Sequence, residues 1–392
     1  MTDFEAFSVD RQALVTDLVN MIRIPSVNCF GANDPQYPAE AAMADYLEKR
    51  LNCLGISTES RVVSDGRRNV WGTVKGTGDG PTVLLAGHLD TVGVEGYDGP
   101  FDPKAEDGKI FGRGSCDMKA GLAAYLEVAR ILIETERQLS GDLIIAGVVD
   151  EEHAMIGSKD YGVNGPQIDY AIVAEPTSLA ICPAHKGQIC MTIKTHGLAA
   201  HSSMPEKGTN AIYHMGDVVQ ALRDYADTLG RREPDAMCGQ PSFSIGVIRG
   251  GDNACSVPDF CEIDVDRRTI PGETYETVMA ELRDVMKGVQ ARLPGLQCEF
   301  ADPFLNLPPL ATPHTSPVMV ALQTGCELTL GAPSPVSAFP GSTDAPNFNC
   351  PTVICGAGDL AQCHSLNEYI AIDEIESAVK IYLNAIIMLQ GS

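Results

Sequence analysis

The chain has 392 residues, of which 44% are hydrophobic and 20% are charged, a composition typical of a soluble globular protein with room for two domains. Its net charge of -24 excludes nucleic acid and anionic membranes as partners, because both require a basic protein surface. No apolar run approaches the roughly 20 residues of a membrane-spanning helix, and the amino terminus, MTDFEAFSVDRQ, lacks a signal-peptide pattern. We therefore expect a cytoplasmic protein whose 13 cysteines are free, buried thiols.

Helical and strand patterns alternate in the first half of the chain, which is typical of an α/β sheet. Amphipathic or Ala- and Leu-rich stretches predict the helices, and short aliphatic runs predict buried strands. The predicted helices are residues 11–22, 39–54 and 120–134, and the predicted strands are residues 82–86, 143–149 and 170–174.

From about residue 186 the pattern changes to half-exposed strands and amphipathic helices in the order β-α-β-β-α, which predicts a small α+β module with an antiparallel sheet. Its strands are expected at residues 188–197, 241–251 and 260–270, and its helices at residues 211–229 and 274–293. The remainder is predicted as an extended return segment at residues 309–317, a buried strand at 352–355 and a closing helix at 375–389.

These elements predict an α/β fold, with a mixed, mostly parallel sheet and helices on both faces, interrupted by a smaller α+β domain. The α/β domain is expected to comprise residues 1–185 and 299–392, and the inserted domain residues 186–298.

Side chains that can bind metal ions follow the predicted buried strands, each just after its strand ends. In an open α/β sheet, binding sites form outside the carboxyl ends of the strands, so these loops converge if the strands are parallel neighbours. One further carboxylate, Asp117, precedes the helix at residues 120–134, whose amino-terminal dipole also favours negative charge there. The six candidates are His88, Asp117, Glu151, Glu152, Glu175 and His364.

This set of imidazoles and carboxylates is the one that a two-metal hydrolase requires. Asp90 lies two residues after His88, on the same side of an extended segment, and can hold its second ring nitrogen. Asp117 can bridge two ions, because a carboxylate has two oxygens. Neighbouring side chains point in different directions, so one of Glu151 and Glu152 can bind metal while the other acts as general base. Taken singly, each residue also fits a solvated loop, a structural histidine or a helix cap.

The motifs resemble the M20 family of metallo-amidohydrolases and peptidases. From IPSV at residues 24–27 to HSLNEY at residues 364–369, the segments GHLDTV, DGKIFGRGSCDMKAGLAA, DEE, AEPT, AHKGQ and HSSMPEKGTNAI match the family in order and spacing. Within the family, AEPTSLAICPAHKGQ, GGDN and DRRTIPG are most similar to the acetylornithine deacetylase and desuccinylase branch. The sequence has no dinucleotide fingerprint, P-loop, nucleophile elbow or H-E-x-x-H motif.

The resemblance implies a dinuclear centre for two divalent metal ions, expected to be zinc, with cobalt or manganese as alternatives. It implies that one ion is bound by His88, Asp117 and Glu175. The other would be bound by Asp117, Glu152 and His364, so that Asp117 bridges the two ions.

The resemblance also implies catalytic roles outside the ligand set. Glu151 would act as general base and then as general acid, and Asp90 would orient His88. The inserted domain would be a lid or dimerisation domain, so we expect a homodimer. His201, in AAHSS, would reach the active site of the partner subunit and stabilise the tetrahedral oxyanion.

Substrate-binding residues follow from the same resemblance. Arg268, in DRRTIPG, occupies the position expected to bind a substrate carboxylate, and its neighbour Arg267 is a second candidate. The loop PGSTDAPNF resembles the family's substrate loop, which would bring Gly341, Ser342 and Thr343 close to the bound acyl group.

One position departs from the family pattern and puts the substrate in question. Relatives carry Asn before the VPD-type segment where this chain has Cys255, and Asn253 lies two residues earlier. Because a thiol is a weak donor and an amide offers donors and an acceptor, either Asn253 substitutes after a local shift or this contact is missing.

The sequence therefore predicts a dinuclear zinc-dependent amidohydrolase that removes an acetyl- or succinyl-type group from an amino acid or related small amine. Metal-activated water would attack the amide carbonyl, with Glu151 as general base. The alternatives are an M20-type dipeptidase or carboxypeptidase, which also cleaves an amide bond, and a non-catalytic metal-binding homologue.

Overall fold

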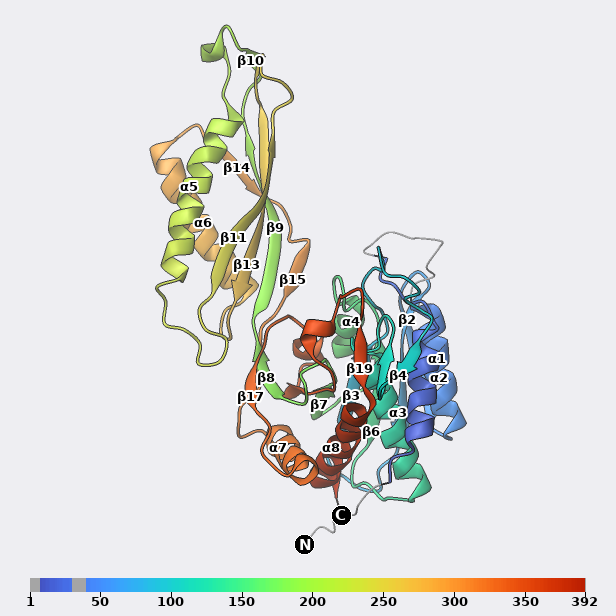
Figure 1. Cartoon of the computed structure of the whole chain (residues 1–392). Coiled ribbons are helices and arrows are strands. Elements are labelled where there is room, and N and C mark those ends of the chain that lie inside the picture. The colour runs from blue at the N-terminus through green and yellow to red at the C-terminus, as the bar shows by residue number, and fades with distance from the viewer. Residues whose placement is uncertain (1–7, 30–39, 392) are drawn as a thin grey trace. The chain divides into compact units, whose positions relative to one another are not determined.

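Two compact units make up the chain in the computed structural model, which describes residues 8–29 and 40–391 (Figure 1). The first unit comprises Met1–Pro183, Ala311–Phe339 and Thr343–Ser392, and the second comprises Ala184–Leu310 and Pro340–Ser342. The second unit continues past residue 298, the predicted end of the inserted domain. It does so because strands β14 (Gln297–Phe300) and β15 (Leu305–Leu307) pair with β9 (Gly187–His196).

The first unit contains, wholly or in part, helices and strands that alternate along the chain. Its helices are α1 (Arg11–Ile22), α2 (Ala41–Cys53), α3 (Lys119–Glu134), α4 (Ile156–Asn164), α7 (Pro317–Leu330) and α8 (Ile372–Gln390), with short 3-10 helices η2 (Ala345–Phe348) and η3 (Leu360–Gln362). Its strands are β1 (Ser57–Ser64), β2 (Arg67–Val74), β3 (Val83–His88), β4 (Lys104–Glu106), β5 (Lys109–Phe111), β6 (Leu143–Val148), β7 (Tyr170–Val173), β8 (Ile181–His185), β16 (Leu310–Ala311), β17 (Val336–Phe339), β18 (Thr352–Ile354) and β19 (Tyr369–Ala371).

A mixed sheet forms the centre of the first unit, and within the described residues its strand order is β1-β2-β6-β3-β7-β18-β8-β16. Strands β6, β3, β7 and β18 run parallel, and β2 and β8 flank them in the antiparallel direction. Every residue of β3 and β6 is buried, as expected for parallel strands covered on both faces. The carboxyl ends of four neighbouring strands therefore lie at one edge of the sheet.

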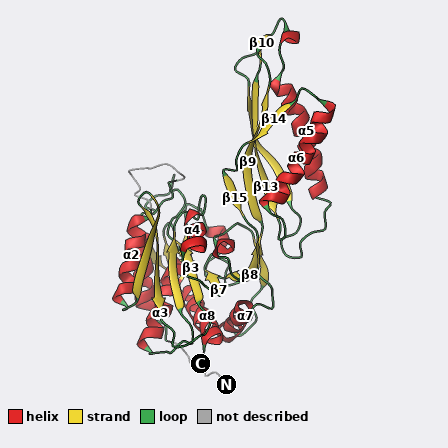
Figure 2. Ribbon diagram, turned by 180° about the vertical axis from the view of Figure 1, so that it is seen from behind, coloured by secondary structure: helices red, strands yellow, loops and turns green. Residues whose placement is uncertain are grey.

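Helices cover both faces of this sheet (Figures 1 and 2). On one face, Gly87 of β3 leaves room for Leu122 of α3, and contacts among α1, α3, α7 and α8 extend this helical layer. On the opposite face, Trp71 of β2 packs edge-on against Tyr161 of α4, with ring centroids 5.5 Å apart. The predicted fold class, a mostly parallel sheet with helices on both faces, is confirmed.

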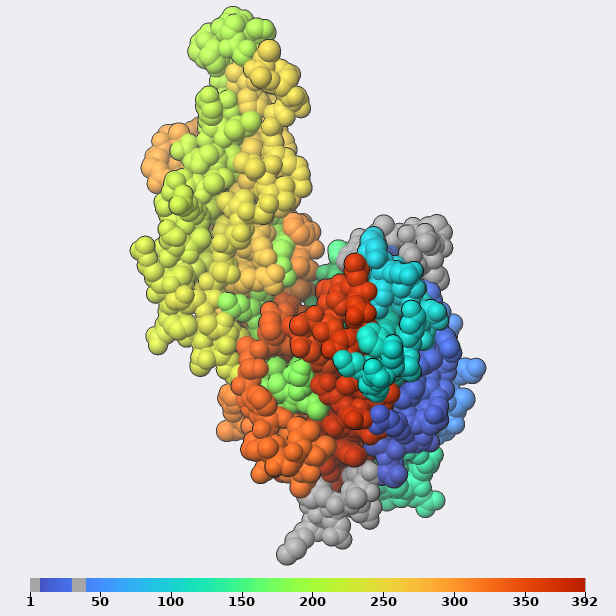
Figure 3. All heavy atoms as spheres, viewed as in Figure 1, coloured from blue at the N-terminus to red at the C-terminus, as the bar shows by residue number. Residues whose placement is uncertain are grey.

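A small three-stranded sheet lies at the surface of the first unit, where β19 (red) is beside β5 and β4 (cyan) in Figure 3. Tyr369 of β19 is opposite Phe111 of β5, although the two residues are far apart in the sequence. This pairing brings the segment that follows His364 close to the segment that precedes Asp117.

The second unit is an α+β module with the element order that the sequence predicts. Its remaining elements are β10 (Ala200–His201), η1 (Pro205–Lys207), α5 (Ala211–Leu229), β11 (Ser242–Gly250), β12 (Ser256–Val257), β13 (Phe260–Thr269) and α6 (Tyr275–Arg292). An antiparallel sheet has the order β11-β13-β9-β14, and α5 and α6 bury its apolar face. Strands β10 and β12 form a separate two-stranded sheet past the carboxyl end of β9 (Figure 1).

Helix α7 was not predicted from the sequence. The expected extended segment at residues 309–317 contains β16, but a helix begins at Pro317, with Ser316 at the N-cap position. Proline is favoured in the first turn because its missing N–H has no helical partner there. The hairpin of β1 and β2 was also missed, since β1 is mostly exposed and has no apolar run.

Three other expectations have mixed outcomes. Residue 39, the predicted start of the second helix, lies outside the described residues, and α2 begins at Ala41. All 13 cysteines are free, but only six of them are buried; five are partly exposed, and Cys53 and Cys255 are exposed. Within residues 8–29 and 40–391, no helix combines the length and apolar character needed to cross a membrane.

Candidate metal centre

The candidate ligands lie at the carboxyl edge of the parallel strands. His88 ends β3, while Glu152 and Glu175 follow the ends of β6 and β7. Asp117 comes from the turn before α3, and His364 from the loop after β18 and η3. The structure brings these residues together in groups of three, and within each group the ligand atoms lie within 4.8 Å of one another.

Two of these groups share Asp117. In the first, His88 Nε2 lies 3.0 Å from Asp117 Oδ1 and 3.9 Å from Glu175 Oε2. In the second, His364 Nε2 lies 3.4 Å from Asp117 Oδ2 and 3.3 Å from Glu152 Oε2. Two ligands that are each about 2 Å from one zinc ion are at most about 4 Å apart, so these separations fit two ions. The two oxygens of Asp117 face different groups, as a bridging carboxylate requires.

The charges of this cluster fit bound cations. Burial, followed by neighbouring carboxylates, raises the pKa of Glu175 and of Glu152. Burial would lower the pKa of His88, but Glu175 and Asp117 outweigh it and raise that pKa well above its usual range. Hydrogen bonds to Asp117 and Glu152 raise the pKa of His364 to about 10. Positive charge nearby stabilises the ionised form of these buried carboxylates, and their oxygens, with the histidine nitrogens, are suitable ligands for divalent metal ions.

Unpaired oxygens point to the same conclusion. Among the described residues, Glu152 Oε1 and Glu175 Oε1 are buried and have no hydrogen-bond partner. A buried carboxylate oxygen without a partner is costly, and coordination to a metal ion would satisfy it. The residues present therefore fit the two-metal centre that the sequence predicts.

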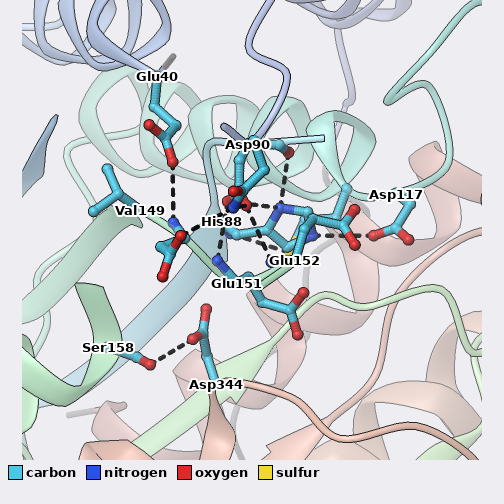
Figure 4. Close-up of polar contacts among 12 residues, drawn as sticks. Glu40, His88, Asp90, Asp117, Val149, Glu151, Glu152, Ser158 and Asp344 are labelled. Atoms are coloured by element: carbon cyan, nitrogen blue, oxygen red, sulfur yellow. Dashed lines mark hydrogen bonds and ion pairs between the residues drawn. The ribbon is translucent and has the colours of Figure 1, made fainter. Parts of the chain in front are cut away.

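Asp90 makes contacts different from those expected. His88 Nδ1 lies 2.9 Å from the backbone oxygen of Asp90 and 3.6 Å from its carboxylate. The carboxylate accepts hydrogen bonds from the backbone N–H groups of Glu151 (3.2 Å) and Glu152 (3.0 Å) (Figure 4). It also accepts one from the Asn28 side chain (2.7 Å). Asp90 therefore orients His88 chiefly through its carbonyl group, and its side chain fixes the turn that carries both glutamates.

Glu151 lies beside the ligands and is partly buried. It forms a third group with His88 and Glu152 whose ligand atoms are also within 4.8 Å, so its position suits either a base or a ligand. Burial, followed by the charge of Glu175, raises the pKa of Glu151 well above its usual range. Asp344, which accepts a hydrogen bond from Ser158, is a further carboxylate close to Glu151 (Figure 4).

A buried polar network behind the glutamates was not found from the sequence. Arg67 forms ion pairs with Glu40 and with Asp150 (2.8 Å), and Asn28 donates to both Asp90 and Asp150. Asp150 has a φ of 72°, the left-handed region that Asp tolerates better than most residues. These residues come from separate elements, so no local spacing could have revealed the network.

In the second unit, His201 is exposed on β10 and its ring is held by Ser203. The backbone N–H of Ser203 donates to Nδ1 (3.2 Å), and the Ser203 hydroxyl lies 2.7 Å from the same nitrogen. Because Nδ1 accepts a hydrogen bond, the proton of the neutral ring is on Nε2. His201 can therefore donate from Nε2, which is the chemistry expected of an oxyanion-binding residue.

Asn253 and Cys255 lie in the loop that joins β11 to β12. The Asn253 side-chain oxygen accepts a hydrogen bond from the backbone N–H of Cys255 (2.9 Å) and lies 3.4 Å from the Ser256 hydroxyl. The side-chain oxygen of Asn253 is therefore already engaged by residues of its own loop. The Cys255 thiol is exposed.

The structure separates the two arginines of DRRTIPG. Arg267 is fully buried and donates to Tyr225 Oη (3.1 Å) and to Glu273 (2.6 Å). Arg268 is partly exposed, and its guanidinium lies 3.1 Å from Asp266. Arg267 therefore has a structural role, and Arg268 is the arginine that a substrate could reach.

The loop at residues 341–344 is divided between the units. The Ser342 hydroxyl donates to the backbone oxygen of Lys186 (3.2 Å), and Gly341 belongs with it to the second unit. Thr343 is buried in the first unit and its hydroxyl accepts from the N–H of Ala345 (3.2 Å).

Substitution of the two arginines should affect different properties, stability for Arg267 and substrate binding for Arg268. We expect Arg267→Gln to lower the free energy of unfolding by about 2 kcal/mol, because it removes the hydrogen bonds of a buried guanidinium to Tyr225 and Glu273, while Arg232 still pairs with Glu273. Arg268→Gln should leave stability within about 0.5 kcal/mol, but raise KM about 10- to 100-fold for substrates that carry a carboxylate. Denaturant unfolding and steady-state kinetics would measure both. A larger stability loss in Arg268→Gln than in Arg267→Gln would contradict the assignment.

Comparison with known proteins is consistent with this geometry. Residues 84–388 match the model of peptidase family M20/M25/M40. The acetylornithine deacetylase of Vibrio vulnificus (strain CMCP6) is 31% identical over 369 residues, which cover 92% of this chain and 95% of that protein. The structure of aminopeptidase PepT from Bacillus cereus ATCC 10987 superposes with a TM-score of 0.77 at 21% identity, covering 97% of this chain and 99% of that one.

A second solved structure carries a description of its metal content. The YXEP protein of Bacillus subtilis, described as a dinuclear metal binding peptidase from the M20 family, has a TM-score of 0.71 at 18% identity, covering 97% of this chain and 98% of that one. The family model and the Vibrio relative both extend over most of the sequence. This chain therefore belongs to peptidase family M20/M25/M40.

Proposed function

We propose that this M20 protein is a two-metal amidohydrolase that removes an acetyl- or succinyl-type group from the nitrogen of an amino acid or similar small amine. The observation that carries the proposal is the position of Asp117, whose two oxygens face two separate ligand groups with Glu151 close by. The substrate class is supported by the 31% identical Vibrio relative, since acetylornithine is an N-acyl amino acid.

The proposed ions are zinc, with cobalt or manganese as alternatives, because histidine and carboxylate ligands accept several divalent metals. His88, Asp117 and Glu175 would hold one ion, and Asp117, Glu152 and His364 the other. When bound, such ions lower the pKa of water and polarise an amide carbonyl. The description of the Bacillus subtilis family member as dinuclear supports the number of ions.

Glu151 is proposed as the group that moves protons. It takes a proton from the attacking water and returns it to the nitrogen of the leaving amine, as the bond between this nitrogen and the carbonyl carbon breaks. The products are the free amine and a carboxylate. The Asp90 carboxylate accepts hydrogen bonds from the backbone N–H groups of both Glu151 and Glu152, which keeps the base beside the ligand groups.

His201 is proposed to complete the site of a second copy of the chain. Arg268 is opposite Gln188 near one end of β9, and His201 lies past the other end at His196. At about 3.3 Å per residue, the two side chains are separated by roughly 25 Å within the unit. One copy therefore cannot present both to the same small substrate.

This argument supports a homodimer that assembles through the second unit, which would then act as the dimerisation domain. Mass measurement in solution tests the assembly. A fully active monomer would contradict the proposed role of His201. The cytoplasmic location stays a prediction of the sequence.

A substrate panel tests the proposed function. The zinc-loaded protein would be assayed with N-acetyl-, N-succinyl- and N-formyl-amino acids beside dipeptides, with and without a chelator. We expect hydrolysis of one or more N-acyl-amino acids, and its loss when the chelator is present. Cleavage of dipeptides alone would identify a peptidase, and two bound ions without any hydrolysis would identify a non-catalytic homologue.

A further inference from the structure

Glu368 joins the two loops that carry Asp117 and His364. It lies four residues after His364, in HSLNEY, and its side chain is fully buried. Both of its carboxylate oxygens accept two hydrogen bonds. Oε2 accepts from Arg113 Nη1 (2.7 Å) and the N–H of Gly114 (3.0 Å), and Oε1 accepts from the N–H groups of Cys116 (2.8 Å) and Asp117 (3.0 Å).

We propose that Glu368 is a positioning residue of the metal centre, which sets the direction of Asp117 and ties it to His364. Three of its four donors are backbone N–H groups of the turn at residues 114–117, and the last of them belongs to Asp117 itself. Fixing that N–H fixes the backbone from which the shared carboxylate projects. The inference rests on the two-metal centre of the proposed function.

No neutral side chain of the same shape can make these four bonds. Glutamine has one acceptor oxygen and one NH2 group, so in either orientation its NH2 group would face two donors. Aspartate keeps the charge but is shorter by one methylene group, or about 1.5 Å. Glutamine therefore removes an acceptor from the turn that presents Asp117, and aspartate draws both acceptors away from it.

The loops stay attached when the carboxylate is changed. The Glu368 backbone oxygen accepts from the N–H of Gly112 (3.1 Å), and β19 pairs with β5 next to it. These backbone contacts do not involve the side chain. We therefore expect Glu368→Gln to stay folded, although it should be less stable than wild type because buried Arg113 loses its ion pair.

The test is a titration of the metal-free protein with zinc in competition with a chelator, for wild type, Glu368→Gln and a matched control. The control is Glu374→Gln, since partly buried Glu374 also accepts a backbone N–H, but from Gly358 (3.0 Å), which is outside the turn before α3. We expect the weaker zinc site of Glu368→Gln to lose about 10- to 100-fold in affinity. The zinc affinity of the control should stay within about twofold of wild type. In Glu368→Gln, kcat should fall by a larger factor than KM rises.

A folded Glu368→Gln protein that binds both ions as tightly as wild type would overturn the proposal. If this variant does not fold, Glu368→Asp replaces it, with the same weakening expected and the same contradiction if it is absent. A third measurement needs no variant: amide hydrogen exchange in metal-free wild type should be slow at Gly114, Cys116 and Asp117. Fast exchange there would also overturn the proposal.

These measurements separate this inference from the proposed function. Zinc titration and hydrogen exchange require no substrate, so failure on the N-acyl panel leaves them interpretable. A protein that binds two ions, depends on Glu368 for the second and hydrolyses no N-acyl-amino acid would contradict only the proposed function. A wild-type protein that binds no metal would contradict both.

Discussion

The Glu151→Gln variant is expected to lose about 10²- to 10⁴-fold in kcat while it binds both metal ions as wild type does. Glutamine has nearly the shape of glutamate but cannot take a proton from water at neutral pH. The turn should be preserved, because Asp90 holds the backbone N–H of Glu151 and not its side chain. Turnover of an N-acyl-amino acid and the zinc content of the purified variant would measure the two effects.

Glu152→Gln is the matched control, since it makes the same change one residue along the same turn. Glu152 belongs to the group with Asp117 and His364, so this variant should lose metal affinity as well as activity. The comparison matters because Glu151 also groups with His88 and Glu152. Loss of an ion from Glu151→Gln would mean that Glu151 is a ligand. Normal turnover by this variant would mean that Glu151 is not the base.

The centre of the site could be predicted from the sequence because it depends on topology. Parallel strands place their carboxyl ends at one edge of a sheet, and aliphatic runs identify such strands without knowledge of their contacts. His88, Glu152 and Glu175 each follow one of these runs, and the structure brings them together with Asp117 and His364. The β-α-β-β-α order of the second unit could also be predicted, since its strands alternate polar and apolar residues and its helices repeat apolar residues every three to four positions.

The residues that support the site could not be predicted in the same way. Glu368 contacts Cys116 and Asp117 across more than 250 positions of sequence, and only the pairing of β19 with β5 brings them together. The Asp90 carboxylate was expected to hold the His88 ring because side chains two positions apart in an extended segment point to the same side. That spacing carries no information about the N–H groups of the turn after β6, which are the donors it contacts.

The choice between Arg267 and Arg268 shows a third limit of prediction from the sequence. Adjacent residues of a strand face opposite sides of the sheet, so sequence predicts that one is buried and the other is not. Which of them is buried depends on the helices that cover the sheet. Arg267 lies on the covered side and bonds to Tyr225 of α5, so Arg268 lies on the uncovered side.

Asp117→Ala is expected to reduce kcat/KM on the order of 10⁴-fold or more, because loss of bound ions removes several kcal/mol of transition-state stabilisation. Asp117 contributes to both ligand groups, with Oδ1 3.0 Å from His88 Nε2 and Oδ2 3.4 Å from His364 Nε2. Its removal leaves two ligands in each group, fewer than the three that catalytic zinc sites use. Zinc content should therefore fall below one ion per chain.

Asp117→Asn separates a bridging role from a simple ligand role. Asparagine keeps one coordinating oxygen but replaces the other with an NH2 group that cannot bind a cation. If Asp117 bridges, this variant should retain one ion per chain and lose the other, and its activity should stay close to that of Asp117→Ala. Asp98→Asn, an exposed aspartate outside the ligand groups, should keep two ions and full activity. Two tightly bound ions in Asp117→Asn would mean that the second oxygen is not a ligand, and the dinuclear arrangement would then require another bridge.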